Sequence, residues 1–303
     1  MCTAVAKYYK DLGWVVSKNR DQDYVSHVTF DDKEHSKVGE ILIMRDLETH
    51  YSEGMNSKGM AIVTTSLTPN LADETDKEDG KLIFKALHLD SPDAAANYLI
   101  KNKLCGFIFI VTPEKLISIE AARTQDGEGK YHAYKRVVPK NEIFCSTNHG
   151  IHFEWAGFQY GIDDQQDIWR KSSEMRLKQA QEVAKDAENP EHMLNQLAKI
   201  KNKDLQFNLF RVENKPRQMR TIFQWSLIPS QENVIVRPIQ CKMKVDVSRE
   251  HINIDVLDNE PLKKLYDGRI RHFSKVVLTK DDKYIKTVIQ TEQMMNFKQF
   301  MKA

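Results

Sequence analysis

Met1-Cys2-Thr3 and the segment Lys18-Asn19-Arg20-Asp21-Gln22-Asp23 are the stretches around which the fold is predicted to be built. Removal of an initiator Met before a residue as small as Cys is ordinary processing, and it would make Cys2 the first residue of the mature chain. A free α-amino group titrates near pH ~7.7–8.0 and can accept the proton of a thiol. Cys2 would then combine nucleophile and general base, without a remote His. Judged by its position alone, a Cys at residue two can also occur by chance and have no functional meaning.

Length and composition are those of a globular protein. The chain has 303 residues, 41% of them hydrophobic and 29% charged, which argues against wholesale disorder and against a membrane protein. This length can bury one large core or two modest ones, and we expect a single domain over residues 1–303. No apolar run approaches the ~18–20 residues of a membrane span, and no signal-peptide pattern opens the sequence. We therefore expect a cytoplasmic protein without a membrane partner.

Charge and cysteine usage exclude two further classes of site. Lys and Arg number 45 against 43 Asp and Glu, a net charge of +2, so no global field attracts nucleic acid. The four cysteines, at positions 2, 105, 145 and 241, form no CxxC or Cys/His cluster. Neither a metal site nor a disulfide framework is therefore expected. Cys105 and Cys145 lie in apolar runs and are expected to be small buried side chains.

Apolar periodicity predicts groups of strands separated by helices along the chain. A helix is expected from the Ser91-Pro92-Asp93 start, a second from Ser172, a third from Asn189-Pro190, and a short one over 291–303. The segments 24–38, 68–81 and 151–168 read as loops, the second of them strongly acidic. Strands are expected at 14–16, 39–45, 61–67, 107–111, 116–120, 131–138, 142–145, 221–227, 234–237, 242–247 and 251–256.

The order of these elements predicts the fold class. Strands, a helix, strands, a helix pair and strands follow one another without regular βαβ alternation, which indicates an α+β protein with largely antiparallel sheets. The hairpin of 107–111 and 116–120 has a continuously apolar first arm. Such a strand is covered on both faces, so we expect sheets buried under helices.

Five short motifs occur in one order along the chain: Met1-Cys2-Thr3, Asn19-Arg20-Asp21-Gln22-Asp23, Met55-Asn56-Ser57-Lys58-Gly59-Met60, Ser146-Thr147-Asn148-His149 and Ser172-Ser173-Glu174-Met175-Arg176. Together they resemble the N-terminal nucleophile hydrolases of the choloylglycine hydrolase and penicillin V acylase family. The acyl-coenzyme A:6-aminopenicillanic acid acyltransferases are similar too. The resemblance spans roughly residues 2–240. Residues 241–303 add no motif and are expected to form C-terminal strands and a helix.

This resemblance implies a four-layer αββα sandwich with two mainly antiparallel sheets. It also implies hydrolysis of a linear, non-peptide amide in a small-molecule N-acyl substrate, through an acyl-enzyme on Cys2 and without a cofactor. Two alternatives remain open at this stage: acyl transfer on the same site, and a non-catalytic binding protein that has kept the fold. Relatives are often multimeric, which makes a homo-oligomer compatible with the resemblance.

The resemblance also implies roles for charged residues around the nucleophile. Arg20 matches an arginine beside the nucleophile, where a fixed cation favours thiolate. The family's acid stands three residues after that arginine, which selects Asp23, and Asp21 is close enough to compete. This carboxylate would orient the N-terminal amine. Arg176 would complete the charge network around Cys2.

Polar residues are expected to stabilise the reaction intermediate. Asn148 matches the family's oxyanion asparagine, whose amide donates to the developing negative oxygen. His149 is expected to be structural or to line the substrate site, because Cys2 already has a base. Asn56 opens a turn that leads to a second oxyanion donor, which falls near Ser66, where relatives carry Asn or Tyr. A backbone N–H is the alternative donor there.

Three observations bear on the subfamily and the substrate. Only Met1 precedes Cys2, which fits the amidases better than the acyltransferases with their longer precursors. The Asn-Arg-Asp sequence also resembles a Golgi-organisation family that continues with Glu, where this chain has Gln22. Five aromatic side chains either line an acyl pocket or serve as packing residues: Phe153, Trp155, Phe158, Tyr160 and Trp169.

Overall fold

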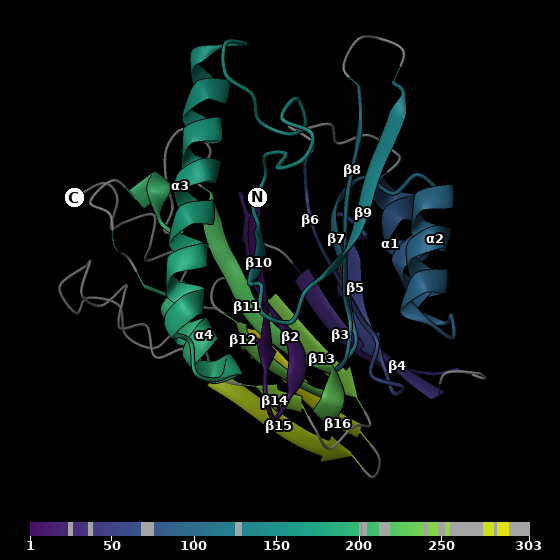
Figure 1. The fold of residues 1–303 in the computed structure, drawn as a ribbon. Helices are drawn as coiled ribbons and strands as arrows, with labels where there is room; N and C mark the ends of the chain where they lie inside the picture. The colour runs from purple at the N-terminus through teal and green to yellow at the C-terminus, as the bar shows by residue number, and fades with distance from the viewer. Residues whose placement is uncertain are drawn as a thin grey trace, which may run out of the picture.

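The computed structural model describes most of the chain in two β-sheets and four α-helices. The sheets lie between two helical layers (Figure 1). The helix expected at 291–303 lies outside the described residues. These are 1–23, 27–35, 39–67, 76–124, 129–199, 201, 205–211, 219–238, 242–247, 252–254, 275–281 and 284–290.

The first sheet has six strands in the order β10-β1-β2-β11-β12-β14. Its neighbours are antiparallel except β12 and β14, which run parallel. The N-terminal hairpin of β1 and β2 forms its centre together with β11. The bounds are β1 Cys2–Tyr9, β2 Gly13–Gln22, β10 Phe144–Ser146, β11 Arg220–Ile228, β12 Asn233–Pro238 and β14 Ile252–Ile254.

The second sheet has ten strands in the order β15-β16-β13-β3-β4-β5-β6-β7-β8-β9. All its pairs are antiparallel except β13 with β3. The bounds are β3 His27–His35, β4 Gly39–Asp46, β5 Ser52–Asn56, β6 Ala61–Thr65, β7 Gly106–Val111, β8 Leu116–Arg123, β9 Tyr131–Val138, β13 Lys242–Val247, β15 Lys275–Asp281 and β16 Tyr284–Gln290.

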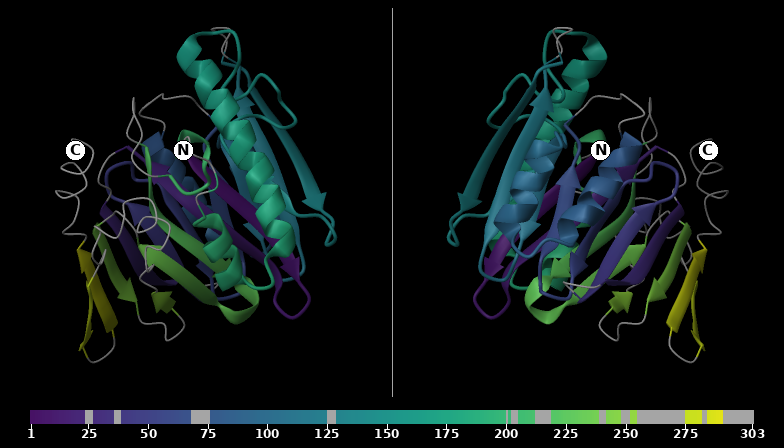
Figure 2. Two further views of the ribbon diagram at one scale, coloured as in Figure 1. Left: turned by 90° about the vertical axis from the view of Figure 1, so that its left-hand side faces the viewer. Right: turned by 90° about the vertical axis from the view of Figure 1, so that its right-hand side faces the viewer.

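One pair of helices covers the outer face of each sheet. Helices α3 (Asp164–Asp186) and α4 (Pro190–Leu197) pack on the first sheet, and α1 (Asp76–Leu87) and α2 (Pro92–Lys101) pack on the second (Figures 1 and 2). Two 3-10 turns, η1 (Leu205–Phe207) and η2 (Pro229–Gln231), complete the described elements. The predicted α+β class and four-layer αββα sandwich are therefore confirmed. None of the described helices combines the length and apolarity that a membrane crossing requires.

Alternation along β1 decides which residues face which layer. Ala4 and Ala6 belong to the apolar cluster between the two sheets, whereas Val5 packs with residues of α3 and α4 in a separate cluster. Successive side chains of a strand point to opposite faces. The side chain of Cys2 therefore shares the inter-sheet face of Ala4, and Thr3 shares the helix-facing side of Val5.

Several predicted boundaries are confirmed because local chemistry fixes them. The Ser91 side chain accepts the N–H of Ala94 at the start of α2, and the Asn189 side chain accepts the N–H of His192 at the start of α4. Each helix has Pro at its first position, where a missing N–H costs nothing. The hairpin of β7 and β8 is present, and β7 is buried along its whole length.

Helix α3 begins at Asp164, not at Ser172 as predicted. The Asp163 side chain caps it by accepting the N–H of Gln166, and Asp164 and Asp167 add favourable negative charge to its first turn. Ser172 and Ser173 lie inside the helix and are buried against the rest of the fold. Buried polar partners, rather than a helix start, explain these two serines.

All three predicted loops contain regular structure, and the segment 151–168 ends in the first turn of α3, which begins at Asp164. Residues 24–38 include β3, which pairs with β4 from Val28 opposite Asp46 to His35 opposite Gly39. The acidic segment 68–81 runs into α1, which begins at Asp76. Both elements are too polar for their periodicity to be visible, and they form because a neighbouring strand or sheet face pairs with them.

Smaller differences concern pairing and burial. The strands predicted at 242–247 and 251–256 are present as β13 and the shorter β14, but their neighbours β3 and β12 run parallel to them. Cys145 is buried as expected, whereas Cys105 is only partly buried. Cys105 directly precedes β7 rather than lying inside it.

A fully buried ion pair joins the two sheets. Lys18 of β2 donates to the carboxylate of Glu53 on β5, to the carbonyl of Thr64 at 2.6 Å and to the hydroxyl of Tyr51 at 3.0 Å. The Glu53 carboxylate also accepts the Thr64 N–H at 2.8 Å and the Tyr51 hydroxyl. These contacts compensate for the burial of both charges.

We expect Lys18→Met to lower the free energy of unfolding by ~3–5 kcal/mol, because it leaves the Glu53 carboxylate buried without its counter-ion. Urea unfolding measures this difference. Lys58→Met is the matched control, since Lys58 pairs with Asp90 at 3.7 Å on the surface and exposed pairs contribute little. Adding Glu53→Leu to Lys18→Met should recover stability. Equal effects of the two single lysine changes would contradict the buried pair's importance.

Candidate active site

Cys2 begins the central hairpin of the first sheet. Strand β1 lies between β10 and β2, and Cys2 pairs directly with Arg20. Residues directly opposite in an antiparallel pair share one face of the sheet. The thiol of Cys2 and the guanidinium of Arg20 therefore lie side by side between the two sheets, and both residues are buried.

Arg20 is held in place from the second sheet. Its Nη2 donates to Asp46 Oδ2 at 2.6 Å, and the guanidinium lies 4.3 Å from the centre of the Tyr51 ring. Tyr51 also contacts the buried Lys18. The predicted cation beside Cys2 is thus positioned by an ion pair and an aromatic ring, which limits its movement.

The Cys2 main-chain nitrogen is the second fixed point of the site. It donates to Asn148 Oδ1 at 3.2 Å. Met1 continues the β1–β2 pairing, since its amino group donates to the carbonyl of Asp21 and its carbonyl accepts the Asp21 N–H, both at 2.8 Å. Removal of Met1 would turn the atom that faces Asn148 into a free α-amine.

Asn148 follows β10 and its side-chain amide has three partners. Besides Cys2, its Oδ1 accepts from Arg176 Nη2 at 3.0 Å, while its Nδ2 donates to the carbonyl of Ser66 at 2.8 Å. These contacts fix which end of the amide is the donor. The donor end faces the segment after β6, the region in which a second oxyanion donor is expected.

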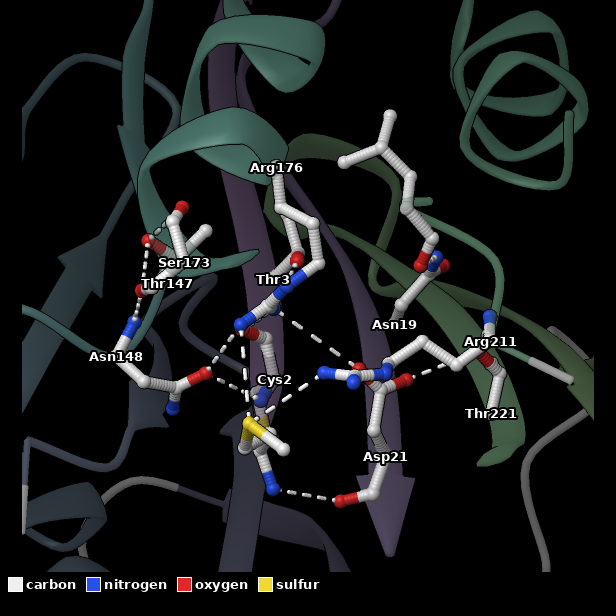
Figure 3. A network of polar contacts seen from close by, with 12 residues as sticks. Cys2, Thr3, Asn19, Asp21, Thr147, Asn148, Ser173, Arg176, Arg211 and Thr221 are labelled. Atoms are coloured by element: carbon white, nitrogen blue, oxygen red, sulfur yellow. Dashed lines mark hydrogen bonds and ion pairs between the residues drawn. The ribbon is translucent and has the colours of Figure 1, made fainter. Parts of the chain in front are cut away.

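Helix α3 holds Asn148 and Cys2 through two residues that are three positions apart and therefore on one side of the helix. Ser173 Oγ accepts the Asn148 N–H at 2.8 Å. Arg176 Nη1 donates to the Cys2 carbonyl and to Thr3 Oγ1, each at 3.0 Å (Figure 3). The Ser-Ser-x-x-Arg motif thus fixes the main chain around Cys2 from the helix side.

A second group of charges lies on the helix side of β2. The fully buried Asp21 accepts the Thr221 hydroxyl on Oδ1 at 2.9 Å, and its Oδ2 lies 4.0 Å from Arg176 Nη1. Burial raises the pKa of Asp21, and the guanidinium groups of Arg211 and Arg176 oppose this shift. Burial also lowers the pKa of Arg211, against the effect of Asp21.

Of the two acids left open by the sequence, Asp21 is the one beside the chain terminus. Asp23 lies on the exposed bend after β2. Three-residue spacing from Arg20 pointed to Asp23, but the β1–β2 register brings Asp21 level with Met1. A strand alternates its faces, so Asp21 points to the helix layer while Arg20 points between the sheets.

The remaining predicted residues have supporting positions. Asn56 Oδ1 accepts the N–H groups of Lys58 and Met60, and its Nδ2 donates to Leu87 at the end of α1. Asn56 therefore fixes the predicted turn and does not contact Cys2 directly. Ser66 is exposed and offers its carbonyl, not its side chain, to Asn148.

His149 is held by hydroxyl groups of the motif residues. Its Nδ1 lies 2.8 Å from Ser173 Oγ and 3.2 Å from Thr147 Oγ1. Burial, and next Arg170, lowers the pKa of His149 to about 4. The contacts of Nδ1 with these motif hydroxyls favour the structural role of the two predicted for His149.

The five aromatic side chains are largely packing residues. Phe153 and Trp155 pack against the inter-sheet cluster, and Phe158 contacts Trp169 with ring centres 5.3 Å apart. Tyr160 is exposed and donates to Glu174 at 2.7 Å. Within the described part of the chain, no group of three or more His, Cys, Asp and Glu is arranged to hold a metal ion.

Sequence reasoning missed three members of the site. Arg211 and Thr221 lie near Asp21 but carry no motif, because they reach the site only through the pairing of β11 with β2. Of these three residues, only Lys18 could have been found from the sequence. It stands two residues before Arg20 in the same strand, so both side chains point to the same face of the sheet. A lysine in an apolar strand is normally exposed, which hides that signal.

No protein-family model and no curated protein matches this sequence. Solved structures that match this chain include penicillin V acylase from Agrobacterium tumefaciens, with a TM-score of 0.44 and 12% identity; the match covers 78% of this chain and 86% of that chain. A mutant conjugated bile acid hydrolase from Clostridium perfringens matches with a TM-score of 0.43 and 14% identity, covering 85% of this chain and 100% of that chain.

The depressed pKa of His149 predicts a pH-dependent stability. The unfolded chain binds a proton on His149 near pH ~6.5 and the folded chain only near about 4. The contribution of His149 to the free energy of unfolding is therefore fully present above pH ~6.5. As the pH falls toward 4, the free energy of unfolding decreases by on the order of 3 kcal/mol. Urea unfolding of the wild type and of His149→Asn across this range measures the difference. Parallel pH dependences in both proteins would contradict it.

Proposed function

We propose that the chain, once Met1 is removed, is a cysteine N-terminal nucleophile amidohydrolase that cleaves a linear amide. The observation that carries the proposal is the environment of Cys2: its nitrogen lies 3.2 Å from Asn148 Oδ1 while Arg20 is its direct cross-strand partner. One residue thus presents a thiol beside a cation and an incipient amine beside a hydrogen-bond acceptor. These are the two requirements of a nucleophile that carries its own base.

The reaction follows from these positions. The α-amine of Cys2 takes the thiol proton, and the thiolate sulfur attacks the substrate's carbonyl carbon. The negative charge that develops on the carbonyl oxygen is stabilised by a hydrogen bond from Asn148 Nδ2. The ammonium group then gives its proton to the leaving nitrogen as the carbon–nitrogen bond breaks. Water attacks the resulting thioester, with the same amine as base, and releases the carboxylic acid.

The neighbouring charges support each state of Cys2. Arg20 stabilises the thiolate from the inter-sheet side. Arg176 holds the Cys2 carbonyl at 3.0 Å, which keeps the main chain still while the sulfur reacts. Asp21 lies beside the position of the amine on the helix side, where a carboxylate favours the ammonium form. Asn148 Oδ1 orients the amine for both proton transfers.

Met1 decides whether this site can act. With Met1 attached, the Cys2 nitrogen is an amide that donates to Asn148 and cannot accept a proton. A chain that keeps Met1 therefore retains the thiol but lacks the base. Met1 removal is the chemical step that separates the amidohydrolase from a non-catalytic protein of the same architecture.

Intact-mass analysis before and after exposure to a panel of activated acyl amides tests the proposal. We expect the native mass to lack Met1 and to increase by one acyl group that maps to Cys2. Cys105→Ala removes the partly exposed thiol and should leave the adduct in place, whereas Cys2→Ala should abolish it. Retained Met1 without an adduct would overturn the proposal.

Asn148→Ala should lower kcat by ~10²–10³, because one oxyanion donor is lost. Steady-state hydrolysis measured beside the intact mass checks this value. Asn102→Ala is the matched control: that asparagine also donates its side-chain amide to a carbonyl, that of Tyr98, but it is exposed at the end of α2. An equal loss in both variants would argue against an oxyanion role for Asn148.

A further inference from the structure

The carboxylate of Glu120 on β8 is buried and binds three consecutive main-chain N–H groups. Its Oε1 accepts from Ile151 at 3.1 Å and from Phe153 at 2.8 Å. Its Oε2 accepts from His152 at 2.8 Å. Glu120 is 4% exposed, and no lysine or arginine among the described residues forms an ion pair with it. Main-chain N–H groups that converge in this way form a binding site for an anion, so this segment compensates for the burial of the carboxylate.

The three N–H groups belong to a loop whose base is Asn148. The carbonyl of Asn148 accepts the N–H of Phe158 at 3.2 Å. The carbonyl of Ala156 accepts the N–H of Gly150 at 2.8 Å, which closes the loop further. The loop is thus held at its base by its own hydrogen bonds, and beyond the base by Glu120 from the second sheet.

Two glycines allow this loop to pack without free space. A Cβ at Gly150 would lie 1.9 Å from the carbonyl oxygen of Phe153 and 3.0 Å from Glu120 Oε1. A Cβ at Gly157, whose φ is +74°, would lie 2.3 Å from the carbonyl oxygen of Asn148. Because the main chain is packed this closely, a movement of the segment bound to Glu120 has to displace residues at the base of the loop.

Asn148 itself is also held from the helix layer (Figure 3). Ser173 accepts its N–H, and Arg176 donates to its Oδ1. Its Nδ2 carries two N–H groups, of which one donates to the Ser66 carbonyl. The other has no partner among the described residues, so it can donate to a developing oxyanion. Such a donor acts only within about 2.7–3.1 Å of the reacting oxygen, and the position of the Asn148 main chain is therefore critical.

We propose that Glu120 is a positioning residue: its carboxylate fixes the loop that starts at Asn148 and thereby the direction of the oxyanion donor. The inference rests on the proposed function, because that function assigns the oxyanion to Asn148. Glu120 supports Asn148 from the second sheet, whereas Ser173 and Arg176 support it from α3. Negative charge on the substrate oxygen develops only in the transition state, so a displaced donor lowers kcat and leaves KM nearly unchanged.

Glu120→Gln tests this role with little change in size. The amide keeps one acceptor oxygen and replaces the other with an NH₂ group that cannot accept an N–H, so the loop loses part of its anchor. We expect kcat to decrease about tenfold, less than on loss of the donor itself, and KM to stay within about twofold. Activity is expressed per Cys2 acyl adduct counted by intact mass, so any loss of folded protein cancels.

A double-mutant cycle separates a positioning role from a general effect on the fold. In the Asn148→Ala protein the donor is already absent, so adding Glu120→Gln should change kcat by less than about twofold. Glu114→Gln is the matched control, since Glu114 is exposed and pairs with Lys140 at 2.6 Å; it should leave kcat unchanged. An equal decrease in both backgrounds, or an unchanged kcat in Glu120→Gln, would overturn the positioning role.

The side-chain amide resonance of Asn148 reports the same position without turnover. In NMR spectra of the native protein, Asn148→Ala assigns this resonance by its disappearance. Glu120→Gln should move it by more than its line width and Glu114→Gln should not; a resonance that stays in place contradicts the role of Glu120. If the native protein shows neither hydrolysis nor a Cys2 adduct and the resonance still moves, the proposed function fails and the link from Glu120 to Asn148 stands.

Discussion

The antiparallel pairing of β1 with β2 is the constraint on which the candidate site depends. It places Cys2 opposite Arg20 and Ala4 opposite Lys18, so a shift by one residue would turn both basic side chains from the inter-sheet space to the helices. The neighbouring strands β10 and β11 prevent such a shift by pairing with the outer edges of this hairpin. The register also separates two environments of one residue, since the thiol belongs to the inter-sheet side and the main chain of Cys2 is held from the helix side.

Much of the architecture was predictable because it is encoded locally. Caps at Ser91 and Asn189 and the continuously apolar strand β7 are signals of a few residues, and they are confirmed. The acid beside the terminus was not predictable in the same way. Spacing along the chain favours Asp23, but the position of Asp21 depends on the pairing of Met1 across the hairpin. Spacing within one strand cannot reveal a partner contributed by another.

The features that could not be predicted depend on contacts between segments that lie far apart in the sequence. Arg211 reaches the site through the strand that follows it, and β3 forms because β4 pairs with it, although its own residues are mostly polar. The Ser-Ser-x-x-Arg motif of α3, in contrast, could be recognised from the sequence. Ser173 and Arg176 were recognised as a unit, and three-residue spacing on a helix brings both to the same side, where they hold Asn148 and Cys2.

The contacts of Met1 also determine when this residue could be removed relative to folding. Its amino group is hydrogen-bonded within the extended hairpin, and burial lowers the pKa of that group. An aminopeptidase has to draw the terminal residue into its own cleft, which is incompatible with a docked β1. In the proposed enzyme, removal of Met1 would therefore compete with the closure of the first sheet. A chain that folded first would keep Met1 and, with it, an amide in place of the proposed base, so the fraction of chains able to react would be set during translation.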